Sequence, residues 1–179
     1  GEDKSIMLPV MVCMDGFILT HGMETIDMPE QEKVNKFLPA YKPLYKLDTA
    51  HPISMGLLAD PDYYMETRFA IQETMKESIG YLSEISKEFN AVFGRDYKDL
   101  LVEEYQLKDA EKVIVAMGSV CGTIKEVVDE QRAKGKKVGL LRIVSFRPFP
   151  YTRVFEALKD VPKVAVLDKS VSLGAYAPI

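Results

Sequence analysis

The sequence predicts an α/β protein built on a doubly wound, mainly parallel sheet. Three short apolar runs carry this prediction: KVIVAM at 112–117, KVGLLRIV at 137–144 and KVAVLD at 163–168. Each run has the length and the valine, leucine and isoleucine content of a strand that is buried on both faces. Amphipathic stretches at 123–135 and 151–160 separate the runs. This alternation of strands and helices predicts right-handed crossovers between parallel strands.

Two further elements are expected before the sheet. The apolar run IMLPVMVCM at 6–14 predicts a buried strand, although Pro9 removes one hydrogen-bond donor from any ladder. Residues 62–93 carry apolar side chains at spacings of three and four, which predicts one long amphipathic helix with a core-facing stripe. Asp62 is its expected N-cap, and Gly94 is its expected stop.

The stretch between these elements has a different character. Residues 27–61 contain five prolines, several tyrosines and little periodicity. Proline fixes the backbone in extended or turn conformations, so this composition predicts a linker. A single helical turn is expected around residues 30–37. The linker predicts a seam between two domains.

Composition and charge exclude several classes of function. Acidic residues outnumber basic ones by 27 to 23, and the net charge of −4 gives no basic surface for nucleic acid. No apolar run approaches the ~20 residues of a membrane span, and the chain begins without a secretory signal, so we expect a cytoplasmic protein. Cys13 and Cys121 form no CxxC pair, so we expect no metal or cluster ligands and two free thiols.

The turn GSVCGT at 118–123, here called the glycine corner, raises a question of function. Its glycines form GxxxG, which is neither a dinucleotide fingerprint nor a P-loop. The amides of Gly118, Ser119, Gly122 and Thr123 could hold an anion at the start of the following helix, with Thr123 as its cap. The structural alternative, which we favour, is that Gly118 turns the chain and Gly122 lets the helix pack closely on the sheet. The corner is therefore a weak cofactor-binding candidate or a partner surface, since ligands and partners of α/β sheets meet the carboxyl ends of strands.

A second group of polar residues lies in CMDGFILTH. Cys13, Asp15 and His21 could form a Cys–His or Asp–His pair for nucleophilic or general-base chemistry. The alternative is a turn in which Asp15 caps and His21 is an ordinary polar residue. We favour the turn because no third orienting group accompanies the pair. We therefore predict no catalytic residue and no metal ligand in this chain.

Two arginines and two tyrosines complete the candidates. Arg142, within an apolar strand, and Arg147, before a proline, could each bind a carboxylate or phosphate. Pairing with an acid of the same chain is the favoured alternative, because buried arginines are usually paired. Tyr63 and Tyr64 suit an interface, although one could belong to the core.

The chain resembles the alpha chain of the pyruvate:ferredoxin oxidoreductase (pyruvate synthase) family over essentially its whole length. The resemblance rests on six phrases in the family's order: LPVMVCMDGFILTHGME, KFLPAY, MGLLADPDYYMETRFAIQE, VIVAMGSVCGTIKEVVDE, GKKVGLLRIVSFRPFP and LDKSVSLGAYAP. It implies that residues 1–26 are the tail of a thiamine-diphosphate-type domain and that 27–52 are a Pro-rich linker. Residues 53–179 would then form an α/β domain like the carboxyl-terminal domain of transketolase, truncated where family members continue.

The resemblance also implies a function. Family members oxidatively decarboxylate pyruvate or another 2-oxo acid on thiamine diphosphate and Mg²⁺, release acetyl-CoA, and pass electrons through [4Fe–4S] clusters to ferredoxin. Pyruvate is the favoured substrate. The family's catalytic and cofactor residues lie outside the matching stretch, so this segment is expected to bind no cofactor itself and to form interfaces with other subunits or domains. The alternative is a stand-alone CoA- or nucleotide-binding module that uses the glycine corner.

Overall fold

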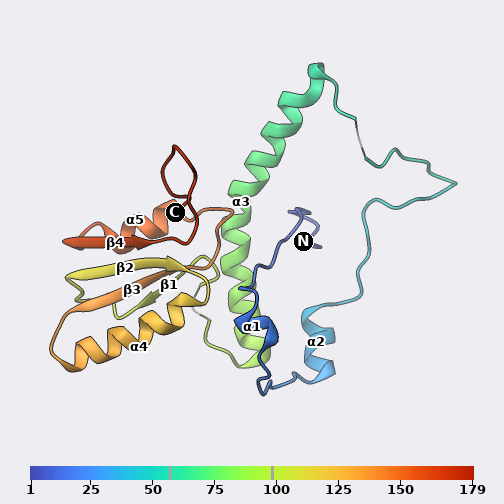
Figure 1. Ribbon diagram of the computed structural model, residues 1–179. Helices are drawn as coiled ribbons and strands as arrows, with labels where there is room; N and C mark the ends of the chain where they lie inside the picture. Colours follow the sequence, from blue (N-terminus) through green and yellow to red (C-terminus); the bar gives the residue numbers. More distant parts are fainter. Residues whose placement is uncertain (57, 98) are drawn as a thin grey trace. The chain divides into compact units, whose positions relative to one another are not determined.

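The computed structural model describes residues 1–56, 58–97 and 99–179 (Figure 1). Its contacts divide the chain into two compact units. The first, called here the helical unit, comprises residues 1–11 and 26–96, and the second, the α/β unit, comprises 12–25 and 97–179. The domain boundaries expected from the resemblance stay a prediction. Within the described residues, no helix has both the length and the apolar content to cross a bilayer.

The long helix of the helical unit, α3 (Pro61–Phe93), confirms the helix expected from the apolar spacing. It begins after Asp60, so the expected cap Asp62 is wrong and lies inside the first turn. The reason is Pro61, whose fixed φ suits the first helical position and whose missing amide is not needed there. Gly94 ends the helix as predicted, in the left-handed region with a φ of 65°.

The apolar stripe of α3 packs at its carboxyl-terminal end. Phe37, at the end of the expected short helix α2 (Gln31–Phe37), lies edge-on to Phe89 and Phe93, with ring centroids 5.4 and 5.6 Å apart. At the other end of α3, four large side chains are exposed: Tyr63, Tyr64, Met65 and Phe69. Met65 and Phe69 belong to the predicted apolar stripe, and Tyr63 and Tyr64 are the tyrosines predicted to suit an interface. The expectation that the stripe packs into a core was therefore wrong for the amino-terminal half of α3 within the helical unit.

The strand expected at 6–14 does not form. These residues are irregular, and the helix α1 (Ile18–His21) follows them. A strand is stable only when a neighbour pairs its backbone, and Pro9 also lacks an amide donor. The run is split between the two units at residue 11. Its side chains are largely exposed at Val10, Met11, Val12 and Met14.

The α/β unit contains a four-stranded sheet in the order β1-β3-β2-β4. The three predicted strands are present and parallel: β2 (Lys112–Met117) lies between β3 (Val138–Ile143) and β4 (Lys163–Leu167). A strand that the sequence did not predict, β1 (Val102–Tyr105), pairs antiparallel with β3. The fold is thus a mixed, mainly parallel sheet, as the predicted fold class requires.

Helices cover opposite faces of this sheet (Figure 1). On one face, α4 (Val120–Ala133) packs Cys121, Ile124 and Val128 against Ala116 and Leu140. On the other face lies α5 (Tyr151–Leu158), and the core there is formed by Val102, Ala110, Val113, Val115, Leu141 and Ile143. Side chains alternate between the faces along each strand, so each strand contributes to both cores. This arrangement confirms the doubly wound prediction.

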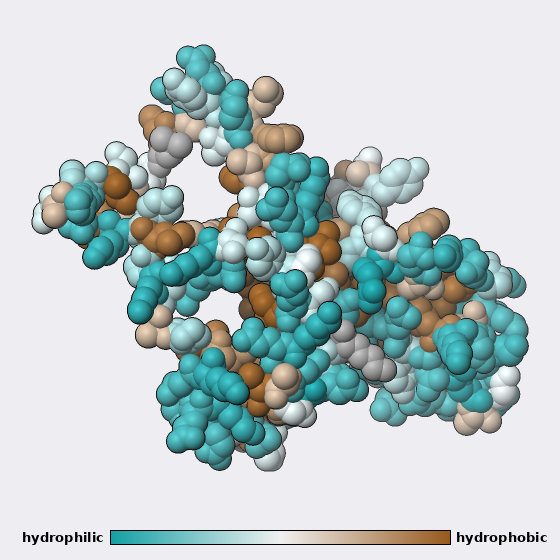
Figure 2. Space-filling view, turned by 180° about the vertical axis from the view of Figure 1, so that it is seen from behind, coloured by the Kyte–Doolittle hydropathy of each residue, from teal (hydrophilic) through white to brown (hydrophobic). Residues whose placement is uncertain are grey.

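The edge strand β4 is less covered than its sequence suggests. Within the described part of the chain it pairs with β2 alone, and all five of its residues are exposed. Val164 and Val166 are in register with Val113 and Val115 and so face the α5 side of the sheet. Figure 2 shows hydrophobic side chains on the surface of the α/β unit among hydrophilic ones.

Candidate functional site

The glycine corner lies at the carboxyl end of β2, where the chain enters α4. Gly118 has a φ of 82°, a left-handed conformation that glycine adopts without steric cost, so its predicted role in the turn is confirmed. Gly122 has a different role from the one predicted. A Cβ built there would meet nothing within 4 Å outside the helix itself, so close packing on the sheet does not require glycine. The helix begins at Val120, which places Thr123 inside it and not at the cap.

A carboxylate of the same chain occupies the corner. The Ser119 amide donates a hydrogen bond of 2.6 Å to Oδ2 of Asp15, which is 104 residues earlier in the chain. The ammonium of Lys169, just after β4, lies 3.8 Å from Oδ1 of the same carboxylate. Asp15 therefore caps α4 rather than a turn of its own segment. The two motifs that the sequence analysis treated separately meet at one point.

The electrostatics of the corner favour an ionised Asp15. Hydrogen bonding by the Ser119 side chain and amide lowers the pKa of Asp15 and outweighs the opposing effect of burial, and the Lys169 charge lowers this pKa further. The start of α4 carries the positive end of the helix dipole, where an anion is favourable. A phosphate in other α/β proteins is held by the same physical features. Here the side chain of Asp15 supplies the negative charge.

The other candidate amides of the corner are only partly available. The Gly122 amide donates to the carbonyl oxygen of Ser119 at 3.0 Å. Ser119 binds Asp15, as described, and Thr123 lies in the first turn of α4. A cofactor-binding role for Gly118, Ser119, Gly122 and Thr123 stays a prediction, and a second anion would have to compete with Asp15.

Arg142 pairs with an acid, as the favoured alternative predicted. It lies directly opposite Glu103 in the β1–β3 register, and its Nη1 is 3.2 Å from Oε2 of Glu103. The ammonium of Lys125 binds the other oxygen of Glu103 and lies 5.2 Å from the ring centroid of Tyr105. Burial alone would raise the pKa of Glu103, but the hydrogen bonds from Lys125 and Arg142 outweigh it and lower that pKa. Glu103 lies on the unpredicted strand β1, so the sequence analysis could not identify this partner.

The other candidate residues do not assemble into a catalytic pair. The His21 ring nitrogen Nδ1 donates to the Phe17 carbonyl at 2.9 Å, which supports the ordinary polar role. Cys13 is exposed and Cys121 is buried, and both are free thiols. Burial raises the pKa of Cys121, which disfavours the reactive thiolate.

Arg147 does not form the ion pair with an acid that the favoured interpretation predicted. Its guanidinium lies 4.2 Å from the centroid of the Phe146 ring, and its Nη1 donates to the Phe146 carbonyl at 2.6 Å. Within the part of the chain that the structure describes, no acid pairs with it. The expected ion pair was wrong here because the neighbouring aromatic face and carbonyl satisfy the cation locally.

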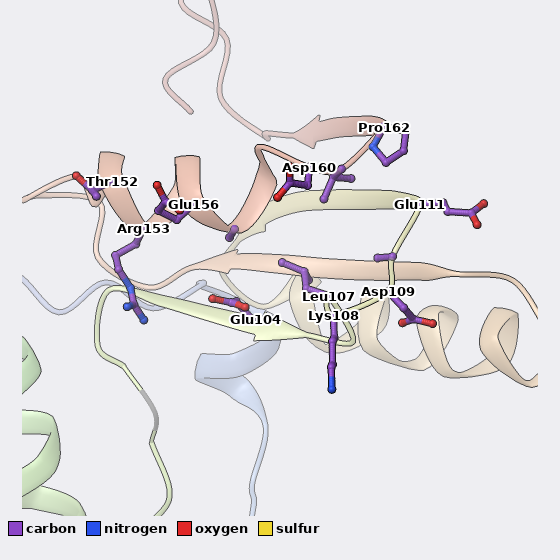
Figure 3. Close-up of a pocket in the computed structure, with 13 residues that line it drawn as sticks. Glu104, Leu107, Lys108, Asp109, Glu111, Thr152, Arg153, Glu156, Asp160 and Pro162 are labelled. Atoms are coloured by element: carbon purple, nitrogen blue, oxygen red, sulfur yellow. The ribbon is translucent and has the colours of Figure 1, made fainter.

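A groove of about 660 Å³ lies at the opposite end of the sheet (Figure 3). It is bordered by the turn that precedes β2, by α5, and by Pro162 before β4. The side chains drawn there are mostly charged, with more acids than bases. Ligands of doubly wound sheets bind at the carboxyl ends of the strands, and this groove meets the amino ends of β2 and β4. No residue that the sequence analysis selected lies in it.

Thiamine diphosphate, which the resemblance implies for the whole enzyme, does not fit the residues of the glycine corner. A diphosphate would place its negative oxygens against the ionised Asp15. A magnesium–diphosphate site also needs oxygen ligands for the metal. Among the described residues, no three His, Cys, Asp or Glu side chains are grouped to hold a metal.

Two family models and several known proteins are similar to this chain. Residues 2–87 match the model of the pyruvate flavodoxin/ferredoxin oxidoreductase thiamine-diphosphate-binding domain, and residues 110–179 match that of pyruvate:ferredoxin oxidoreductase core domain II. The chain is 50% identical over 174 residues to pyruvate synthase subunit PorA of Methanothermobacter thermautotrophicus and 51% identical over 175 residues to that of Methanocaldococcus jannaschii. Each alignment covers 97% of this chain and 45% of the relative.

A relative with a different name is also similar. The ketoisovalerate oxidoreductase subunit VorA of Pyrococcus horikoshii is 41% identical over 172 residues, which are 96% of this chain and 43% of the relative. The chain thus spans about half the length of the curated relatives it matches. The two family models lie in the order that the resemblance implied, one over the amino-terminal half and one over the α/β sheet. The chain belongs to the pyruvate:ferredoxin oxidoreductase family.

Proposed function

We propose that this chain is part of the PorA-type subunit of a cytoplasmic enzyme that oxidatively decarboxylates pyruvate to acetyl-CoA. The observation that carries the proposal is an identity of about one half to pyruvate synthase subunits over nearly all of this chain. In the whole enzyme, thiamine diphosphate with Mg²⁺ supplies the carbanion chemistry. Other domains or subunits supply the [4Fe–4S] clusters and the docking site for ferredoxin.

Within that enzyme, this chain acts as a structural and interface-forming segment. Arg142 pairs with Glu103, Asp15 accepts the Ser119 amide, and the buried thiol Cys121 is disfavoured as a nucleophile. Several apolar side chains of the α/β unit are exposed, namely Tyr151, Phe155, Val164, Val166 and Leu167. Exposed apolar surface of this kind is typical of contacts with other subunits or domains.

The alternative of a stand-alone CoA- or nucleotide-binding module has less support. It needs the glycine corner to be open to a phosphate, and Asp15 already accepts the Ser119 amide there. The repulsion between a phosphate and this carboxylate would oppose binding. The choice of pyruvate over a branched 2-oxo acid rests on the identity of 50% and 51% to two PorA relatives, compared with 41% to the VorA relative.

The test is an assay of the whole enzyme purified through an affinity tag on this polypeptide. We expect CoA-dependent reduction of ferredoxin with pyruvate, at a higher kcat/KM than with 2-ketoisovalerate. The same preparation without CoA is the control, since acetyl transfer needs the thiol acceptor. A preference for 2-ketoisovalerate would refute pyruvate as the substrate. Absence of oxidation of either acid by an enzyme with all its subunits would refute the proposed reaction.

A further inference from the structure

We propose that Asp15 is an internal latch, whose carboxylate fastens the segment 12–25 to the glycine corner at the start of α4. The latch connects two parts of the family architecture, because Asp15 lies within the residues matched by the thiamine-diphosphate family model and Ser119 lies within core domain II.

Three segments that are distant in sequence converge at the latch. Asp15 comes from the amino-terminal part of the chain, Ser119 follows β2, and Lys169 follows β4. β2 and β4 are neighbours in the sheet and run parallel, so their carboxyl ends lie at the same edge. The Asp15 carboxylate therefore accepts a hydrogen bond from the Ser119 amide, which follows β2, and faces the Lys169 ammonium, which follows β4. Such charge-assisted contacts are stronger than neutral ones.

The backbone conformation of Gly118 fits this role. Its left-handed φ of 82° aims the following amide at the carboxylate, and a Cβ at this position would lie only 3.0 Å from Oδ2 of Asp15. A larger residue would therefore strain the backbone and also displace the carboxylate. The glycine serves the turn and the latch together.

None of the described side chains in the segment that the latch holds is buried. Residues 12–25 are grouped with the α/β unit, whereas the residues on both sides of them, 1–11 and 26–96, are grouped with the helical unit. Large apolar side chains of the segment that the structure describes are exposed, namely Val12, Met14, Phe17, Leu19 and Met23. Because these side chains bury little apolar surface, the polar contact of Asp15 has a large share in holding the segment.

Hydrogen–deuterium exchange on the full chain, followed by mass spectrometry and by NMR at the Ser119 amide, tests the latch. In Asp15→Ala we expect exchange at the Ser119 amide to rise about tenfold, because the hydrogen bond that protects this amide is lost. We also expect exchange at the His21 amide, which donates to the Phe17 carbonyl within the segment, to rise as the segment is released. Exchange across β2 should stay unchanged. Glu24→Ala, which removes another acid of the same segment, is the matched control and should change neither region.

Two further variants and a ligand keep the test decisive. Asp15→Asn keeps an acceptor oxygen and should raise exchange less than Asp15→Ala, and Lys169→Ala should raise it modestly. Addition of inorganic phosphate to the wild-type chain should leave Ser119 unchanged, because the corner is filled. Unaltered Ser119 exchange in Asp15→Ala, loss of protection throughout β2, or displacement of Asp15 by phosphate would each overturn the latch. The measurement needs no substrate, so its failure would leave the proposed reaction untouched.

Discussion

A glycine in the centre of the sheet offers a direct test of the packing. Gly139 lies in β3, opposite Val113 of β2, and a Cβ added to it would lie 2.7 Å from the carbonyl oxygen of Gln106. This atom belongs to the backbone and cannot swing away like the end of a side chain. Gln106 already has a left-handed φ of 55°, and its oxygen accepts a hydrogen bond from Arg132. The change Gly139→Ala must therefore move the loop after β1 and weaken that hydrogen bond.

The expected cost is about 2 kcal/mol of unfolding free energy, the middle of the range for overpacking a close-packed site. At a urea slope of ~2 kcal/mol/M, this lowers the unfolding midpoint by about 1 M. Gly122→Ala is the matched control, because a Cβ there meets open space and alanine favours a helix by up to ~1 kcal/mol. Circular dichroism in urea measures the unfolding midpoint of each variant. Equal midpoints for Gly139→Ala and the wild type, or a destabilised Gly122→Ala, would refute this account of the two glycines.

Three further predictions concern the core, the ion pairs and the cofactor. Leu141→Ala should cost about 2–5 kcal/mol in a urea melt, since the side chain is fully buried, whereas the exposed Val166→Ala should cost within about 0.5 kcal/mol; equal losses would contradict the assigned burial. Glu103→Gln should be less stable than the wild type at neutral pH. Because the folded pKa of Glu103 is lowered, its contribution is present above the ordinary glutamate pKa and is lost as the pH falls through the lowered value; a gap in urea midpoints that persists in acid would count against the pairing. Calorimetry of this chain with thiamine diphosphate and Mg²⁺ should give no saturable heat, and tight binding would contradict the non-catalytic role proposed for this segment.

The parallel strands could be predicted because each is a short, continuous apolar run, and such a run indicates a buried strand without reference to any distant part of the chain. β2 and β3 bury their side chains on both faces, and such burial needs no special partner to be inferred. β1 escaped prediction because its sequence, VEEY, is half acidic, and it is stabilised by its place beside β3 and by the pairing of Glu103. The run at 6–14 was mistaken for a strand for the opposite reason. Its apolar residues suit a sheet, but none of the strands that the structure describes pairs with them, and propensity alone cannot supply one.

The glycine corner shows how far a local motif can be interpreted. The turn at Gly118 and the start of a helix soon after it follow from a few residues, since backbone geometry is local. Those features determine that an anion is favoured there, but not which anion. The choice is made by Asp15, 104 residues away, and a contact of that separation leaves no periodicity or spacing in the sequence. A carboxylate tied to the chain has a high effective concentration at the corner, so a free phosphate must overcome both that advantage and the repulsion between like charges. At this corner, therefore, the occupant of the Ser119 amide is decided by a side chain that no local motif could indicate.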